Sequence, residues 1–171
     1  MISFKKCTLE GIDILKEISI KTFIDTYSEY NTEKDMTLYI QDSLSDEALA
    51  KQLTNSESLF YLMFDEKNLI GYLKLNFGKA QSKIYKEDSV EIERIYVLEA
   101  FQHQGFGQQL LDKAFEVAKQ LNKDSLWLAA WEKNEGALAF YRKNQFNHIR
   151  TITFVLGETP FTGLVMERNI K

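Results

Sequence analysis

Residues 89–111 read SVEIERIYVLEAFQHQGFGQQLL and contain a strand, a glycine-bearing loop and the start of a helix. Apolar and polar side chains alternate over 89–97, which predicts a strand. Apolar side chains at helical spacing begin at Phe106 and continue to Leu121, which predicts a helix over 106–121. The strand therefore leads through a short loop into a helix N-terminus.

That loop has the features of an anion-binding site. The first amides of a helix lack intrahelical partners, and the helix dipole makes them attractive to negative charge. Gly105 and Gly107 let a ligand approach the backbone, and no Ser, Thr, Asp or Asn stands at the helix start as a cap. The loop predicts a phosphate cradle, although a bare GxG could also be a simple turn.

Two well-known phosphate-binding motifs do not fit the loop. A P-loop needs GxxxxGK[ST], and the chain has no such run. The dinucleotide fingerprint needs GxGxxG, but Leu110 stands where the third glycine belongs. The loop therefore indicates a phosphate ligand of another kind.

The rest of the chain predicts one α/β domain over residues 1–171, without internal repeats or linkers. Helices are expected to begin at Thr8, Thr32 and Ser45. Residues 78–88 are polar and are expected to form a mobile loop. Further strands are predicted over 2–6, 58–64, 69–77, 125–131, 146–156 and 162–169, with a helix over 134–143. This order predicts one mixed sheet with helices on its faces.

Composition excludes several classes of protein. The 171 residues are 44% hydrophobic and 27% charged, the balance of a soluble globular chain. The net charge of −4 gives no basic footprint, so no nucleic-acid partner is expected. Cys7 is alone, and His103 and His148 lack paired-ligand spacing, so neither a disulfide framework nor a metal site is expected. Without a signal peptide or an apolar run of about 18 residues, a cytoplasmic protein without a membrane partner is expected.

Two segments resemble the GNAT N-acetyltransferases. Gln102-x-x-Gly105-x-Gly107, between a strand and a helix, resembles that family's pyrophosphate loop. The run Trp131-Glu132-Lys133-Asn134, followed by Ala137, Phe140-Tyr141 and Phe146, resembles its next strand and helix. Together they cover about residues 89–147. The resemblance implies the acyl-CoA N-acyltransferase fold, with a mixed, mostly antiparallel sheet of about seven strands flanked by helices.

The resemblance also implies direct acetyl transfer from acetyl-CoA to a primary amine, without a metal. The thioester arm would lie where the sheet splays beside the strand 89–97. The backbone there would hold the arm and the acetyl carbonyl, and amides of the loop would hold the pyrophosphate. The cofactor-binding residues implied in this way are Ile95, Tyr96, Val97, Gln102, His103, Gln104, Gly105, Phe106, Gly107, Gln108, Asn134, Ala137, Tyr141 and Lys143.

Two residues are expected to carry the proton transfers. An alkylamine is only roughly one part in a thousand neutral at pH 7.4, so the enzyme needs a base. Glu91 and Glu93 share one face of their strand, and Glu93 is the preferred relay through water; a solvated face is the alternative. Tyr141 is expected to be the general acid, although it could be a core residue. Asn134 could cap its helix as well as contact the cofactor.

The acceptor is harder to infer. Residues 22–44 resemble the bacterial spermidine/spermine N-acetyltransferases of the PaiA type, which implies a polyamine acceptor. The acids Asp25, Glu29, Glu33 and Asp35 would then line a cationic site, although a solvated helix face is the alternative. Residues 154–164 depart from that branch, which would have acidic and amide residues after the glycine. The expected substrate-binding residues are Phe23, Tyr27, Tyr30, Glu93 and Trp131.

Several alternatives remain open at this stage. The same site could acetylate a peptide, a protein, or another small-molecule amine, as in a resistance or amino-acid acetyltransferase. A non-catalytic acetyl-CoA-binding module would bind cofactor without turnover. A homodimer is also open, because the sequence does not determine the oligomeric state.

Overall fold

The computed structural model describes residues 1–82 and 86–171. The helices are α1 (Ile12–Tyr27), α2 (Glu33–Ser43), α3 (Asp46–Leu53), α4 (Phe106–Gln120) and α5 (Glu135–Lys143). The strands are β1 (Ile2–Lys6), β2 (Ser58–Asp65), β3 (Asn68–Phe77), β4 (Ser89–Val97), β5 (Ser125–Trp131), β6 (Asn147–Leu156) and β7 (Thr159–Asn169). The order of elements along the chain is the one that the sequence predicts.

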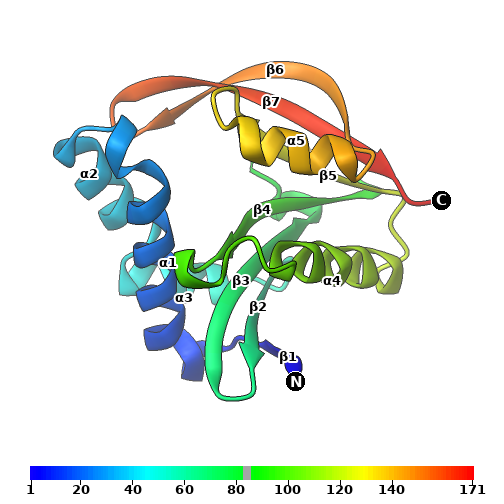
Figure 1. Cartoon of the computed structure of the whole chain (residues 1–171), viewed down its shortest axis with the longest axis horizontal. Coiled ribbons are helices and arrows are strands. Elements are labelled where there is room, and N and C mark those ends of the chain that lie inside the picture. Colours follow the sequence, from blue (N-terminus) through cyan, green and yellow to red (C-terminus); the bar gives the residue numbers. More distant parts are fainter. Residues whose placement is uncertain (83–85) are drawn as a thin grey trace.

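The strands form one seven-stranded sheet in the order β1-β2-β3-β4-β5-β7-β6. Every neighbouring pair is antiparallel except β4 and β5, which are parallel. Their pairing covers only Ser89–Glu91 and Ser125–Trp127, and the two strands then diverge (Figure 1). The expected mixed, mostly antiparallel sheet is confirmed, and so is its splay beside β4.

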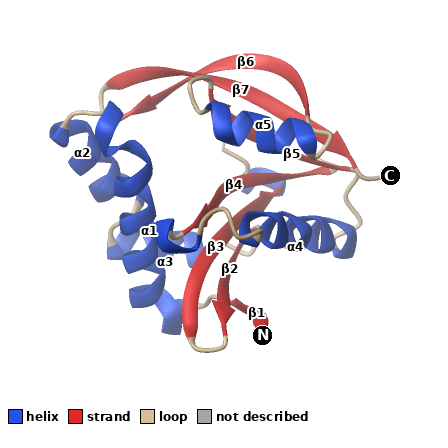
Figure 2. Cartoon of the chain, viewed as in Figure 1, coloured by secondary structure: helices blue, strands red, loops and turns tan. Residues whose placement is uncertain are grey.

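Helices cover both faces of the sheet. One apolar cluster joins α4 and α5 to the sheet and includes Leu110, Leu111 and Leu138. The other joins the N-terminal helices to β2 and β3 through Leu15, Phe60 and other buried side chains. Figure 2 shows α1, α2 and α3 grouped at one side, apart from α4 and α5. Each fully buried large apolar side chain contributes roughly 1.5–3 kcal/mol, so these clusters hold the helices against the sheet.

Side-chain caps fix several helix starts. Thr32 Oγ1 accepts from the Asp35 amide at 3.1 Å, and Ser45 Oγ accepts from the Ala48 amide at 3.2 Å. Both caps confirm the sequence prediction. The side-chain cap expected at Thr8 is wrong, because the Thr8 side chain makes no cap hydrogen bond; its backbone carbonyl accepts from the Gly11 amide at 2.9 Å instead. The resulting 3₁₀ turn delays the start of α1 to Ile12.

The C-terminal hairpin differs from the expected bounds. β7 begins at Thr159, earlier than the predicted 162, and includes Pro160. Pro160 faces Val155 of β6, while the pairing of β7 with β5 starts only at Gly163. Pro160 therefore lies where its missing N–H breaks no ladder with β5. A turn through Gly157, with φ of +63°, connects the two strands.

The mobile loop expected over 78–88 falls partly outside the described residues. Gly78–Ala80 form a 3₁₀ turn, and Gln81 Oε1 accepts from Trp127 Nε1 at 2.6 Å. Residues 83–85 are not described. Among the described helices, none has both the length and the apolar character needed to cross a bilayer.

Candidate active site

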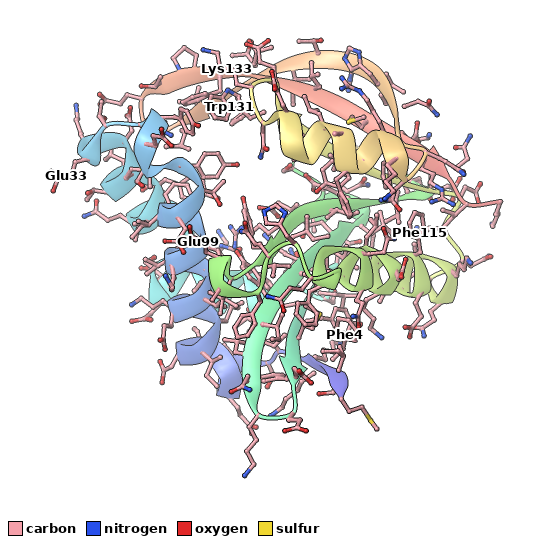
Figure 3. All side chains as sticks on the ribbon, viewed as in Figure 1. Phe4, Glu33, Glu99, Phe115, Trp131 and Lys133 are labelled. Atoms are coloured by element: carbon pink, nitrogen blue, oxygen red, sulfur yellow. The ribbon has the colours of Figure 1, made fainter. Side chains whose placement is uncertain are left out.

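The divergence of β4 and β5 opens the sheet at a small cavity. Its lining joins Glu93 and Ile95 of β4 to Trp131 of β5, and adds Asn134, the N-cap of α5, and Tyr141 from the last turn of α5. Trp131 and Glu99 lie on opposite sides of this opening, Trp131 on β5 and Glu99 on the loop before α4 (Figure 3). Glu93 and Tyr141, the two expected catalytic residues, therefore line one cavity at this opening.

The loop before α4 leaves its amides free. Gly105 is the N-cap residue of α4, with φ of +85° and no side-chain cap hydrogen bond. The amides of residues 103–108 make no hydrogen bond to the described part of the chain. A Cβ built on Gly105 would meet no heavy atom within 4 Å, and one on Gly107 would meet only Phe140 Cζ at 4.0 Å. The geometry fits an open cradle for a phosphate.

Side chains hold the cradle in place. Gln102 Nε2 donates to the Val97 carbonyl at 3.1 Å, and Gln104 Nε2 donates to the Ala100 carbonyl at 3.2 Å. The Phe106 ring meets the Phe101 ring edge-on at a centroid distance of 6.4 Å. The side chains of Gln102, Gln104 and Phe106 thus pack on or bond to the protein itself. The backbone amides of the loop are left to bind a ligand.

A larger cavity of about 390 Å³ connects the cradle to the sheet opening. Of the expected cofactor-binding residues, its lining includes Ile95, Tyr96, Val97, Gln102, His103, Asn134 and Ala137. The Asn134 Oδ1 accepts from the Ala137 amide at 3.1 Å, so Asn134 caps α5 and also borders the cavity. Lys143 is exposed in the last turn of α5 and lines neither this cavity nor the opening.

Several lining residues were not expected from the sequence. Thr22 and Thr26 of α1 line the same cavity, together with Glu99 and Gly136. Asp25, which was expected at the acceptor site, also lines this cavity. The place of these α1 residues carries no local signal, because it depends on how α1 packs against the distant strand β4. Gly136 lies two residues after Asn134, in the first turn of α5, so the predicted α5 cap could have indicated it.

Tyr141 lies against the sheet opening and is 7% exposed. Burial raises the pKa of its phenol above the ordinary value, and the neighbouring Tyr27 adds to that shift. The hydroxyl therefore stays protonated through the neutral range and can act as a proton donor.

The β3–β4 ladder brings Glu91 and Glu93 to the same side of the sheet. A bulge shifts the register between Lys74, which faces Arg94, and Leu75, which faces Ile92, so Glu93 is the extra residue. Asn76 Nδ2 donates to Glu91 Oε2 at 3.0 Å and to Glu93 Oε2 at 2.5 Å. The shared face is confirmed. The alternative of a solvated face is wrong, because Glu91 is buried.

The pKa values of Glu91 and Glu93 are shifted in opposite directions. Burial alone would raise the pKa of Glu93, but the nearby Lys74 and Arg94 outweigh it, and the pKa is lowered. Burial raises the pKa of Glu91 despite hydrogen bonds from Asn76 and Ser82. Glu93 is therefore the firmly ionised carboxylate of the pair.

A third cavity of about 240 Å³ lies on the other side of the opening. Aromatic rings form much of its wall: Phe23 stacks on Tyr39 at 4.2 Å between ring centroids, and Trp131 meets Phe161 edge-on at 5.7 Å. Of the expected substrate-binding residues, Phe23, Tyr27, Glu93 and Trp131 line it. Tyr30 does not line it; its ring packs against Trp131 and is 57% exposed.

The acids of residues 22–44 do not gather into a cationic site. Asp35 is buried and accepts from the Glu158 amide at 2.7 Å and the Thr159 hydroxyl at 2.5 Å, so it fastens the β6–β7 turn. Glu29 and Glu33 are exposed, and Glu33 lies at the outer edge of α2 (Figure 3). Asp25 pairs with Lys21 and borders the cofactor-side cavity. The expectation is wrong because the four acids lie on three different elements, α1, the 3₁₀ turn Ser28–Tyr30 and α2, which point them in different directions.

The β6 strand supplies lining residues that the sequence did not indicate. Ile152, Phe154, Val155 and Leu156 border the third cavity, together with Arg94 of β4. Asp35 holds the β6–β7 turn against α2 across more than a hundred residues of chain, and no local pattern signals such a contact. The departure of residues 154–164 from the polyamine branch therefore falls on the acceptor wall.

A cradle of free amides beside a splayed sheet, with a phenol and a carboxylate at the split, defines a transferase that uses an acyl-CoA. Residues 17–146 match the model of the acetyltransferase (GNAT) family. The chain belongs to that family and is an acetyl-CoA-dependent N-acetyltransferase.

Related proteins cover nearly the whole chain. An uncharacterized N-acetyltransferase from the pepI 3′ region of Lactobacillus delbrueckii subsp. lactis is 34% identical, over 88% of this chain and 87% of its own. A spermidine N(1)-acetyltransferase of Thermoplasma acidophilum is 26% identical, over 98% and 96%. The crystal structure of PaiA N-acetyltransferase from Thermoplasma acidophilum, in complex with coenzyme A, superposes with a TM-score of 0.81 at 23% identity, covering 99% of each chain. This structural likeness supports the fold.

Proposed function

We propose that the enzyme acetylates the primary amine of a small acceptor bound in the 240 Å³ cavity, in a direct transfer. One observation carries the proposal: Glu93 and Tyr141 both border the sheet opening between the cofactor-side and acceptor-side cavities. Glu93, Tyr96 and Trp131 also line the acceptor side, while Ile95, Asn134 and Ala137 also line the cofactor side. Two ligands can therefore meet there.

The residues at the opening suit the two proton transfers. When bound, acetyl-CoA supplies an acetyl group on a thioester. The acceptor nitrogen must lose a proton, because an alkylammonium has a pKa of about 10.4. The ionised Glu93 takes that proton through water, and the protonated Tyr141 phenol donates one to the departing sulfur. The backbone of Ile95 and Val97 and the amides of 103–108 position the cofactor.

The charges of the acceptor wall favour an acceptor with a single ammonium group. Glu91 and Glu93 lie near the buried cations Lys74 and Arg94, so the wall has no surplus of negative charge. A polyamine carries several ammonium groups and would need additional carboxylates there. The described acids of 22–44 do not provide them.

Spermidine and spermine form the second candidate class of acceptor. The relative from Thermoplasma acidophilum that is named a spermidine N(1)-acetyltransferase favours them, since it matches almost the whole chain. Its 26% identity leaves room for a different acceptor wall.

An acceptor screen with acetyl-CoA, monitored by thiol release, tests the proposal. Small monoamines and amino acids should be acetylated faster than spermidine, spermine or a neutral-backbone peptide. Glu93→Gln in the same screen should slow every acceptor that uses this site. If only peptides or only polyamines were acetylated, the corresponding alternative would replace the small-acceptor proposal.

A further inference from the structure

Arg94 is a buried cation whose hydrogen-bonding capacity is largely unused. It lies on β4, lines the acceptor-side cavity and is 5% exposed. Its Nη2 lies 3.7 Å from Glu93 Oε1, which is too long for a hydrogen bond. Its Nε and Nη1 have no hydrogen-bond partner among residues 1–82 and 86–171. A guanidinium in this state is a donor without an acceptor.

The neighbouring charges do not provide that acceptor. Lys74 Nζ forms an ion pair with Glu93 Oε2 at 2.5 Å and donates a hydrogen bond to Gln52 Oε1 at 2.9 Å. Glu93 therefore stands alone between two cations. Glu91 accepts hydrogen bonds from Asn76 and Ser82 instead, and the ion pairs of Lys74 and Arg94 among the described residues go to Glu93. Two buried cations thus share one ion-paired carboxylate, and burying the Arg94 donors without acceptors is costly, which indicates that this wall can take a further anion.

The form of the guanidinium indicates which anion fits. Its planar fork of N–H donors matches the two oxygens of a carboxylate. We propose that Arg94 binds a carboxylate of the acceptor, so that the acceptors are primary aminocarboxylates of the α-amino acid type. This inference rests on the proposed function, because it specifies the acceptor of that same cavity.

The position of Arg94 next to Glu93 sets the spacing between the two acceptor groups. Arg94 would bind the acceptor carboxylate, and the adjacent Glu93 would take the proton of the acceptor amine. The carboxylate and the amine of the acceptor must therefore be only a few bonds apart. The rest of the wall is aromatic and aliphatic, with Phe23, Trp131 and Phe154 among its members. An apolar or aromatic side chain on the acceptor would bury surface there.

Matched pairs of acceptors test the inference on the full-length enzyme. Phenylalanine is compared with phenethylamine, and leucine with 3-methylbutylamine, by kcat/KM from thiol release. The members of each pair differ only in the carboxylate. The wild-type enzyme should prefer the amino acid by at least about 10²-fold, since a site with an unpaired buried donor rejects a ligand without the acceptor. Arg94→Gln should abolish that preference, and Arg94→Lys should retain part of it.

The outcomes separate the two proposals. If wild-type enzyme acetylates phenethylamine as well as or better than phenylalanine, the carboxylate inference is wrong while the proposed function stands. If no primary amine of either kind is acetylated, the proposed function fails and the inference fails with it. Thermal melting and acetyl-CoA affinity establish whether Arg94→Gln folds. If it does not, Arg94→Lys and the wild-type pairs decide, since the wild-type preference needs no variant.

Discussion

The two sides of the active site are built in different ways. The cofactor side uses mainly the backbone of one continuous stretch, from β4 through the loop to α4, together with the first turn of α5. The acceptor side uses side chains from α1, α2, β4, β5 and β6, which are spread along most of the chain. A site built mainly from backbone can therefore be recognised from local sequence, whereas an acceptor wall depends on long-range packing.

The two sides also respond differently to substitution. A free amide is present whatever the side chain, so the cofactor side is sensitive chiefly to an added Cβ at its glycines. On the acceptor side, a change of charge alters a buried network that includes Lys74, Glu93 and Arg94.

The largest effect is expected for Gly107→Val. The backbone of Gly107 is not in the left-handed region, and its Cβ would meet only Phe140 Cζ at 4.0 Å, so α4 should still form. The valine would occupy the space in front of the free amides. We expect acetyl-CoA affinity to fall by more than about 10²-fold, as for other displacements of a bound group, measured by calorimetry.

Gln104→Ala is the matched control for that variant. It removes a side chain that bonds the Ala100 carbonyl and leaves the amide in place. Its affinity for acetyl-CoA should remain close to that of the wild type. Wild-type affinity in Gly107→Val would overturn the backbone cradle. Gly105→Val is a poorer test, because φ of +85° strains any residue with a Cβ.

The next largest effect is expected for Tyr141→Phe, at the junction of the two sides. Loss of the hydroxyl should lower kcat by about 10²-fold, the lower range for a positioned acid. Acetyl-CoA affinity and melting temperature should change little, because the ring remains. Tyr61→Phe, on β2 and outside all the cavities of the site, is the control. Lower thermal stability with normal turnover would show that Tyr141 is a core residue instead.

The pH dependence provides a second check on Tyr141. The phenol acts in its protonated form, and burial holds its pKa above the ordinary value of about 10. Loss of activity through its ionisation should therefore begin only above about pH 10. If wild-type activity instead fell as the pH rose near neutrality, and Tyr141→Phe removed that fall, this assignment would be contradicted.

Glu93→Gln tests the acceptor side directly. We expect kcat/KM to fall by about 10- to 100-fold. The carboxylate is needed in its ionised form, and Lys74 and Arg94 lower its pKa despite burial. Its acid limb should therefore lie below about pH 4.3 and should vanish in the variant.

Glu91→Gln is the matched control, because Glu91 shares Asn76 with Glu93 but has its pKa raised by burial. It should lower kcat/KM less than Glu93→Gln. A larger loss in Glu91→Gln would make Glu91 the base. Glu93→Gln should also lower the melting temperature, because it leaves two buried cations without a carboxylate.

The same division explains what could be predicted from sequence. The strand, loop and helix over 89–121 follow from local periodicity and glycines, and so does the cap at Asn134. The bulge at Glu93 could not be predicted, because strict alternation would separate Glu93 and Arg94 onto opposite faces. The role of Arg94 in the acceptor wall depends on that single extra residue.

The acceptor wall itself lacks a local signal. Asp35 looked like one of several acids on a helix, yet it fastens a turn that is distant in sequence. That contact brings β6 to α2 and so completes the cavity with Phe154 and its neighbours. Only the three-dimensional packing determines which acids face a ligand and which hold the chain together.

The smallest effect is expected for Asp35→Asn, which tests whether the two sides are independent. The asparagine amide would place an N–H group against a donor, either the Glu158 amide or the Thr159 hydroxyl. The turn should loosen and move β6, so the acceptor KM should rise severalfold while acetyl-CoA affinity stays unchanged.

Hydrogen bonds from Thr159 and from the Glu158 amide lower the pKa of Asp35. Its contribution to stability is thus present above the unfolded-state value of about 3.9 and is lost as pH falls through the lower folded value. The melting temperature of Asp35→Asn should therefore lie a few degrees below that of the wild type at neutral pH, and the difference should narrow below about pH 4. Glu33→Gln, an exposed carboxylate on the same helix, should change neither quantity, and a parallel loss of acetyl-CoA affinity in Asp35→Asn would show that the two sides are coupled.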